Sequence, residues 1–134
     1  MTTIDTYVEW LSLFSSNDPE KFRSCVERPI RLELQLQLAR KGVEEATWIV
    51  RNKHVSVEVL RTLSASSHAA VRWEVASKRR APPDVLRLLA VDPEPSVRER
   101  IAMNRKAPLD IIERLASDPE GFVARAARRR LSEK

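Results

Sequence analysis

The stretch Pro82–Asn104, PPDVLRLLAVDPEPSVRERIAMN, contains two short helix patterns. Its first half begins with two prolines, which suit the first turn of a helix because a missing N–H costs nothing there. Three apolar residues then share one helical face, at i, i+3 and i+4: Leu86, Leu89 and Ala90. In the second half, Asp92 is predicted to cap a helix that starts at Pro93. Three more apolar residues form the face predicted to be buried there: Val97, Ile101 and Ala102.

This pattern recurs along the chain with a period of about 26 residues, and a fixed period of this length indicates a repeat array. The matching positions further along the chain are Pro108, Asp110, Ile112, Leu115, Ala116, Asp118–Glu120 and Val123. The matching positions before it are Leu60, Leu63, Val71, Arg72, Val75 and Ala76. Helices of about ten residues are too short to be stable alone, so neighbouring helix pairs are predicted to stack and bury their apolar faces together.

The repeat frame covers residues 44–134. It comprises a helix at Glu45–Arg51 and three helix pairs, at Val55–Ser77, Pro82–Met103 and Pro108–Arg130. Residues 1–43 match the pattern poorly, and we expect them to form a diverged N-terminal cap, because terminal units of such arrays are atypical. The prediction is therefore an all-α fold in which residues 1–134 form a single α-solenoid domain.

The N-terminal cap is predicted to begin with a helix at residues 3–15, capped by Thr2 or Thr3. Its apolar face would hold Ile4, Tyr7, Val8, Leu11 and Phe14. Asp18 is expected to open a second helix, whose apolar stripe would hold Phe22, Cys25 and Val26. On that stripe, Cys25 is interpreted as a small buried hydrophobic residue.

Residues Pro29–Lys41 carry two conflicting signals. Apolar and polar residues alternate strictly from Ile30 to Leu38, as in a strand. The residues themselves are strong helix formers, however, and a lone strand in a helical stack would have no partner. We interpret the segment as a helix, which Gly42 could end in a left-handed conformation.

Composition and charge restrict the class of protein. The chain has no apolar run of about 18 residues, no basic signal-peptide start and a single cysteine, so we expect a soluble, cytoplasmic protein without a membrane span or a disulfide framework. Residues 1–50 carry six Lys/Arg and eight Asp/Glu, a net charge of −2, whereas residues 51–134 carry eighteen and eleven, a net charge of +7. The basic part is thus the repeat part, which favours an acidic protein or a nucleic acid as partner.

The motif Pro-x-x-x-Leu-x-x-Leu-Ala-x-Asp-Pro-x-x-x-Val-Arg-x-x-Ile-Ala-x-Asn resembles the leucine-rich repeat variant family and the broader class of HEAT-like α-solenoids. The resemblance covers residues 44–134 and implies a curved, right-handed stack of helix pairs. Some family members carry a cysteine-rich cluster domain, but this chain has only Cys25, so no such cofactor carries over. HEAT-like proteins mostly bind other macromolecules, and a few related ones are DNA glycosylases, which are longer.

Residues that could carry chemistry have simpler structural interpretations. Arg72 and Arg98 recur with the fold, so we expect a ladder in which each arginine pairs with an aspartate of its own or the next unit, such as Asp118. His54 and His68 have no carboxylate or cysteine cluster at metal-ligand spacing, and we expect neither metal nor cofactor. Two glycines cannot form a phosphate-binding loop, and no carboxylate pair stands out for acid–base catalysis.

The main functional feature is a basic ridge, predicted to lie along one edge of the stack. It comprises Lys53, His54, Lys78, Arg79, Arg80, Arg105, Lys106, Arg128, Arg129 and Arg130. Trp73 occupies the repeat position held elsewhere by Glu99 and Arg125, and this position is predicted to be exposed. Trp73 could therefore anchor a partner, or it could pack over the join between two units. The alternative interpretation of the ridge is a solvated edge that interacts favourably with helix C-termini.

Together these features predict a non-enzymatic binding module with no small-molecule substrate. An acidic protein is the favoured partner. It would contact Lys53, Trp73, Lys78, Arg79, Arg80, Arg105, Lys106, Arg125 and Arg129. Nucleic acid bound through its phosphates is the alternative, although the ridge lacks interleaved aromatic residues for base stacking. A small enzyme of the glycosylase type is the third and least favoured class.

Overall fold

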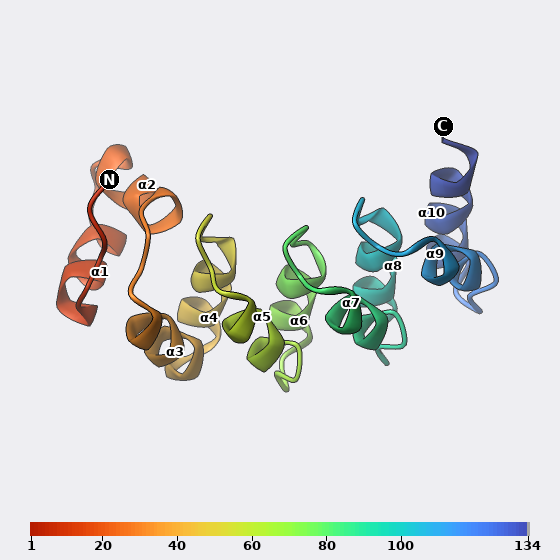
Figure 1. The fold of residues 1–134 in the computed structure, drawn as a ribbon, viewed down its shortest axis with the longest axis horizontal. Coiled ribbons are helices and arrows are strands. Elements are labelled where there is room, and N and C mark those ends of the chain that lie inside the picture. Colours follow the sequence, from red (N-terminus) through yellow and green to blue (C-terminus); the bar gives the residue numbers. More distant parts are fainter. Residues whose placement is uncertain (134) are drawn as a thin grey trace. The chain divides into compact units, whose positions relative to one another are not determined.

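The computed structural model describes residues 1–133 and is all-α, as predicted, with no strand in that range. The chain divides into two compact units, Met1–Leu63 and Ser64–Lys134. Five helices belong to the first unit: α1 (Tyr7–Phe14), α2 (Pro19–Glu27), α3 (Leu32–Lys41), α4 (Val43–Arg51) and α5 (Val57–Leu63). Five belong to the second (Figure 1): α6 (Ala69–Ala76), α7 (Pro83–Leu89), α8 (Pro95–Met103), α9 (Leu109–Leu115) and α10 (Gly121–Ser132).

In the second unit, α8 is the central helix. It packs against α6 and α10, which lie on either side of it, and against the two shorter helices α7 and α9 (Figure 1). The apolar positions predicted from the repeat are its core, each at most 2% exposed: Leu86, Leu89, Ala90, Val97, Ile101 and Ala102. Pro83 is the first residue of α7 and follows Pro82 as N-cap, so the helix start predicted from the two prolines is confirmed.

The start of α8 differs from the prediction. Asp92 does not cap this helix, which begins at Pro95 with Glu94 as its N-cap. The Asp92 carboxylate accepts a hydrogen bond from the Glu94 backbone N–H at 2.9 Å and also binds Arg72. These two contacts hold the Asp-Pro-Glu segment as a turn, so the helix starts two positions later than the Asp-Pro signal indicates.

An arginine–aspartate ladder repeats within the second unit. Arg72 donates to Asp92 at 2.7 and 3.1 Å, and Arg98 donates to Asp118 at 2.8 and 3.1 Å. Each arginine also donates to the backbone carbonyl six positions before it, that of Ser66 or Asp92. The two pairs have the same sequence separation and lie one repeat period apart, so the predicted structural role of Arg72 and Arg98 is confirmed.

A buried asparagine performs an equivalent task in each unit. The Asn104 side-chain amide donates to the carbonyls of Ala76 and Lys78, and its oxygen accepts from the Lys106 N–H. In the first unit, the Asn52 amide donates to the carbonyls of Cys25 and Arg28. The two asparagines are separated by twice the repeat period. Asn104 fixes the loop after α8 to the end of α6, and Asn52 fixes the loop after α4 to the end of α2.

The first helix was predicted wrongly in its start and its buried face. It begins at Tyr7, with the Thr6 hydroxyl accepting from the Glu9 N–H, because Ile4 instead forms an isolated parallel bridge with Ile30. Trp10 is the buried residue of α1 and is 1% exposed, while Val8 is 77% exposed. Tyr7 and Phe14 of the predicted stripe stack against Trp10, so the packed face of α1 is that of Tyr7, Trp10 and Phe14, and Val8 and Leu11 lie outside it.

The ambiguous segment is a helix, as interpreted, from Leu32 to Lys41. Ile30, just before it, forms the bridge to Ile4, and the flanking Pro29 and Arg31 make its backbone hydrogen bonds, which explains part of the strand-like signal. The predicted left-handed conformation of Gly42 was wrong. Its φ of 175° and ψ of 178° are fully extended, and Gly42 joins α3 directly to α4.

Candidate functional site

A basic groove runs over α8 in the second unit. It consists of two neighbouring pockets: one of about 390 Å³ between α8 and α10, and one of about 180 Å³ between α8 and the loop after α6. Met103 and Arg105 line both parts. The charged residues of the basic groove are six arginines and two glutamates: Arg79, Arg100, Arg105, Arg125, Arg129, Arg130, Glu99 and Glu133. The groove therefore carries a local excess of four positive charges.

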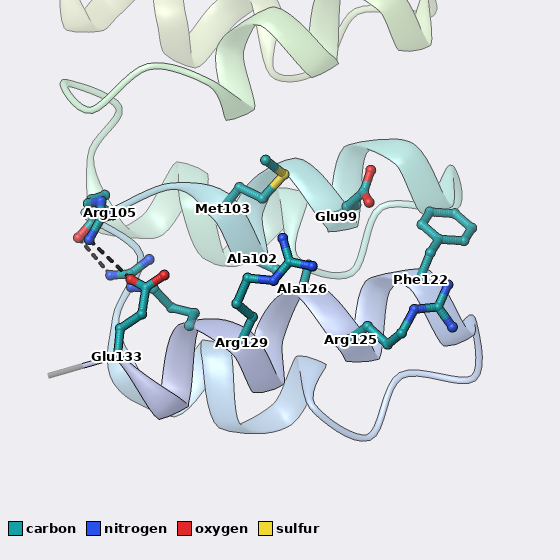
Figure 2. A pocket seen from close by; sticks show the side chains of 10 residues that line it. Glu99, Ala102, Met103, Arg105, Phe122, Arg125, Ala126, Arg129 and Glu133 are labelled. Carbon is teal, nitrogen blue, oxygen red and sulfur yellow. Dashed lines mark hydrogen bonds and ion pairs between the residues drawn. The ribbon is translucent and has the colours of Figure 1, made fainter.

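Three of these arginines are held by neighbouring groups. Arg105 forms an ion pair with Glu133 at 3.2 Å, at one end of the groove (Figure 2). Arg130 donates to the backbone carbonyls of Asn104 and Arg105 at 2.7 and 2.9 Å. Arg100 donates to the Ser77 hydroxyl at 2.8 Å. These contacts fix the position of the three side chains and satisfy part of their hydrogen-bonding capacity.

The other three arginines are available to a ligand. Within residues 1–133, the side chains of Arg79, Arg125 and Arg129 form no hydrogen bond or ion pair, and all three residues are exposed. Arg125 and Arg129 lie one turn apart on α10, so both point from the same face of the helix. Figure 2 shows Arg129 extending from α10 towards α8, between Met103 and Arg125. The groove thus holds two arginine residues, one helical turn apart, whose side-chain donors are unsatisfied by the rest of the described chain.

Four apolar residues line the larger pocket of the basic groove together with these arginines, and we call them the apolar strip. It consists of Ala102 and Met103 from α8 and Phe122 and Ala126 from α10. Ala102 is fully buried, while Met103 is 53% and Phe122 37% exposed. In Figure 2, Phe122 lies near Arg125 at the end of the pocket opposite Arg105 and Glu133. The groove therefore combines apolar surface with positive charge.

Trp73 lies beside the basic groove rather than in its lining. Its ring is half-buried, and the Arg100 guanidinium lies over it at 4.6 Å from the ring centroid. The Ser77 hydroxyl, which accepts from Arg100, also donates to the Trp73 carbonyl at 2.9 Å. Trp73 of α6 is thus packed beneath a side chain of the next helix pair, where it supports Arg100.

The structure separates the members of the predicted ridge. Arg79, Arg105, Arg129 and Arg130 line the basic groove together with the predicted contact residue Arg125. Lys106 and Arg80 are exposed in loops outside the lining. Arg128 lies on a different face of α10 and donates to the Ala116 carbonyl at 3.1 Å. Within the second unit, the basic groove is therefore lined by some of the ridge residues and by other residues, such as Arg125, that do not belong to the ridge.

Two predicted contact lysines have other surroundings. Lys53 lies in the first unit, where its ammonium is 3.7 Å from a Glu27 carboxylate oxygen. Lys78 is half-buried, and burial lowers its pKa from the ordinary lysine range, with a smaller contribution from the nearby charge of Arg80. His54 contacts the Glu27 carbonyl through Nε2 at 3.0 Å. Neither lysine lines the basic groove.

Sequence reasoning missed the apolar part of the site, Met103 and Phe122. It also missed the contacts of Arg100 with the Trp73 ring and the Ser77 hydroxyl. The sequence does carry a periodic signal for the α10 wall. Four of the α10 residues that line the groove follow helical spacing: Phe122, Arg125, Ala126 and Arg129. Met103 follows the buried pair Ile101–Ala102 and was not distinguished from it. Only the packing of α8 against α10 shows that the two walls face each other.

Two other classes of site are not formed by the described part of the chain. Residues 1–133 contain no group of three or more His, Cys, Asp or Glu side chains placed to hold a metal ion. None of the helices among these residues has the length and hydrophobicity of a membrane-spanning segment.

Comparison with known proteins returned no match: no family model, curated protein or solved structure is significantly similar to this chain.

Proposed function

We propose that this chain is a non-enzymatic binding module built as a short α-solenoid, and that its basic groove binds an acidic segment of a partner protein. The single observation that carries the binding site is the pair Arg125 and Arg129. These two guanidinium groups lie one turn apart on α10 and are unpaired within residues 1–133. Carboxylates are natural ligands for such donors, because a guanidinium presents a planar fork that matches a carboxylate.

The solenoid part of the proposal rests on recurrence. The arginine–aspartate ladder and the apolar core positions recur at the same period in the second unit. Helices as short as α7 and α9 gain their stability from neighbours rather than from their own length. A right-handed stack of such pairs, with residues 1–43 as the N-terminal cap, is the arrangement that accounts for this recurrence.

An acidic protein is favoured over nucleic acid because of the lining of the groove. The exposed apolar side chains of Met103 and Phe122 have no counterpart along a phosphate backbone, and Glu99 and Glu133 would repel phosphates. Six arginines in one groove are the specific observation in favour of the second candidate, a nucleic acid bound through its phosphates.

The test is affinity capture from the source cell with the full chain, with and without nuclease. Arg125→Glu/Arg129→Glu is compared with Lys106→Glu/Arg128→Glu, which changes the net charge equally but replaces residues outside the groove lining. We expect the wild type and the Lys106/Arg128 variant to capture the same partner protein whether or not nuclease is added. The Arg125/Arg129 variant is expected to lose it. Loss of capture after nuclease treatment would favour nucleic acid. Equal capture by both variants would exclude the basic groove as the site.

A further inference from the structure

The basic groove has features that define its ligand more narrowly than charge alone. Its lining includes the apolar strip of Ala102, Met103, Phe122 and Ala126, and its arginines Arg125 and Arg129, unpaired within residues 1–133, lie on the α10 wall. Met103 and Phe122 leave 53% and 37% of their surface exposed within a concave site. Apolar area of this kind gives little affinity unless a ligand covers it with apolar groups.

The size of the larger pocket limits what can enter it. A volume of about 390 Å³ is at the small end of the range for ligand sites, so it accommodates a few side chains rather than a folded surface. The helix α10 that forms one wall has 12 residues and is therefore about 18 Å long. A segment of similar length can lie along it and place side chains on both the strip and the arginines.

The carboxylate of Glu133 shows which ligand group suits this groove. It lies against Arg105 at 3.2 Å, at the end of the same pocket. The chain therefore already places one carboxylate on a groove arginine, while Arg125 and Arg129 have no such group within residues 1–133. Carboxylates from a ligand would complete the same pattern along the α10 wall.

We infer that the basic groove recognises an acidic amphipathic segment, with its apolar side chains on the strip and its carboxylates on Arg125 and Arg129. This inference rests on the proposed function and adds the requirement for an apolar face. Charge brings the segment to the groove, and the strip selects among acidic segments, because apolar contact at the centre of an interface supplies much of the affinity.

The experiment uses two synthetic peptides of equal length, about four helical turns each. Their compositions are identical, rich in glutamate and with four leucines. In the first peptide the leucines share one helical face; in the second they are scattered around the helix. Binding to the full chain is measured by fluorescence anisotropy at fixed salt. The amphipathic peptide is expected to bind at least tenfold more tightly than the scattered one.

Two variants of the protein test the two parts of the site. Arg125→Gln/Arg129→Gln is expected to weaken both peptides at least tenfold, while the matched control Arg40→Gln/Arg114→Gln, which removes two exposed arginines elsewhere, leaves both unchanged. Met103→Ser/Phe122→Ser is expected to remove the preference for the amphipathic peptide. Its control, Leu88→Ser/Val91→Ser, replaces exposed apolar residues outside the groove and should preserve that preference.

The outcomes separate this inference from the proposed function. Equal binding of the two peptides, still dependent on Arg125 and Arg129, would overturn the inference and leave the acidic-partner proposal standing. Failure of both peptides to bind, with duplex DNA binding through the same two arginines, would overturn both. Peptide binding that is insensitive to both groove variants would also overturn both, because the basic groove would not be the site.

Discussion

Arg98 holds Asp118 through two parallel hydrogen bonds, from Nε to Oδ2 at 2.8 Å and from Nη2 to Oδ1 at 3.1 Å. Both side chains are largely buried, with 14% and 6% of their surface exposed. The Asp118 carboxylate also accepts from the Glu120 N–H at 2.9 Å, and the third Arg98 nitrogen donates to the Asp92 carbonyl. This pair therefore ties α8 to the turn that precedes α10 and connects two successive helix pairs.

Removing the arginine from this pair should destabilise the protein. Arg98→Met keeps the apolar stem but leaves the Asp118 carboxylate buried without its counter-charge, at a cost of about 3 kcal/mol. The measurement is the free energy of unfolding from urea titration at neutral pH. Arg87 and Asp110 provide the control, because they form the same kind of bidentate pair, at 2.6 and 3.2 Å, on the exposed surface. Arg87→Met should leave the urea midpoint nearly unchanged, and equal effects of the two substitutions would contradict the argument from burial.

The same pair predicts how stability depends on pH. The hydrogen bonds from Arg98 hold the pKa of Asp118 below the ordinary aspartate range, and burial only partly opposes this. A carboxyl group with a lowered folded-state pKa stabilises the protein above its unfolded pKa of about 4, and this contribution is lost as the pH falls through the folded-state pKa. The free energy of unfolding should therefore fall from about pH 5 towards pH 2, and it should fall less steeply in Arg98→Met. Parallel profiles for the two proteins would show that Asp118 does not carry this dependence.

The all-α class and the buried positions of the second unit could be predicted from the sequence because the apolar pattern is periodic. Residues such as Leu89 and Ile101 recur at helical spacing and again one repeat later, so local pattern and long-range packing agree. The errors occur where a side chain makes a tertiary contact that differs from the local structure its sequence pattern indicates. Asp92 reads as a helix cap but binds Arg72 from the preceding helix pair. Ile4 is predicted to belong to a helical stripe, but it pairs with Ile30, which follows α2 in the sequence.

The site was predicted less completely, since its geometry depends on which side chains satisfy one another. All the ridge residues look alike in the sequence, yet Arg105 is paired with Glu133 while Arg129 is unpaired within residues 1–133. One period earlier, Arg79 and Ala107 occupy the positions of Arg105 and Glu133, so the pair does not recur and no periodic signal points to it. Met103 could not be assigned to the site either, because its exposure depends on how closely α10 approaches α8.

Core packing gives a prediction with a neighbouring control. Leu89 is 1% exposed, whereas the adjacent Leu88 is 54% exposed. Leu89→Ala should lower the free energy of unfolding by about 2–5 kcal/mol, because it removes apolar contacts and leaves a cavity. Leu88→Ala should change it by about 0.5 kcal/mol or less. Chemical denaturation of both variants tests this, and a loss at Leu88 as large as that at Leu89 would mean that the buried face of α7 has been misassigned.

Cys25 should be unreactive in the folded protein. Burial raises the pKa of its thiol to about 11, against a smaller opposing effect of Arg28, and the thiol lies 3.9 Å from the Trp10 carbonyl oxygen. At pH 8, roughly one thiol in a thousand would then be the reactive thiolate. Alkylation by iodoacetamide at pH 8 should therefore be at least a hundredfold slower in native protein than in guanidinium chloride. Comparable rates would show that the α1–α2 packing opens readily.

The Asn104 side chain fixes the loop between α8 and α9. Asn104 is 5% exposed and satisfies three backbone groups at once, two carbonyls through its amide and the Lys106 N–H through its oxygen. Asn104→Ala leaves these groups without their partner, and the cost should be about 2 kcal/mol. Asn104→Asp keeps the acceptor but places a negative charge against the carbonyls of Ala76 and Lys78, so it should cost more than alanine.

The ranking of these two variants distinguishes the mechanisms that could explain a loss of stability. If Asn104 only filled space, aspartate, which has nearly the same shape, would be tolerated better than alanine. If it acts through its amide donor, aspartate is the worse substitution, and its cost shrinks as the pH falls and the carboxyl group is protonated. Urea unfolding of both variants at pH 7 and pH 4 measures this, with Asn17→Ala at an exposed position as the neutral control. Aspartate that is more stable than alanine at pH 7 would rule out the donor role of Asn104.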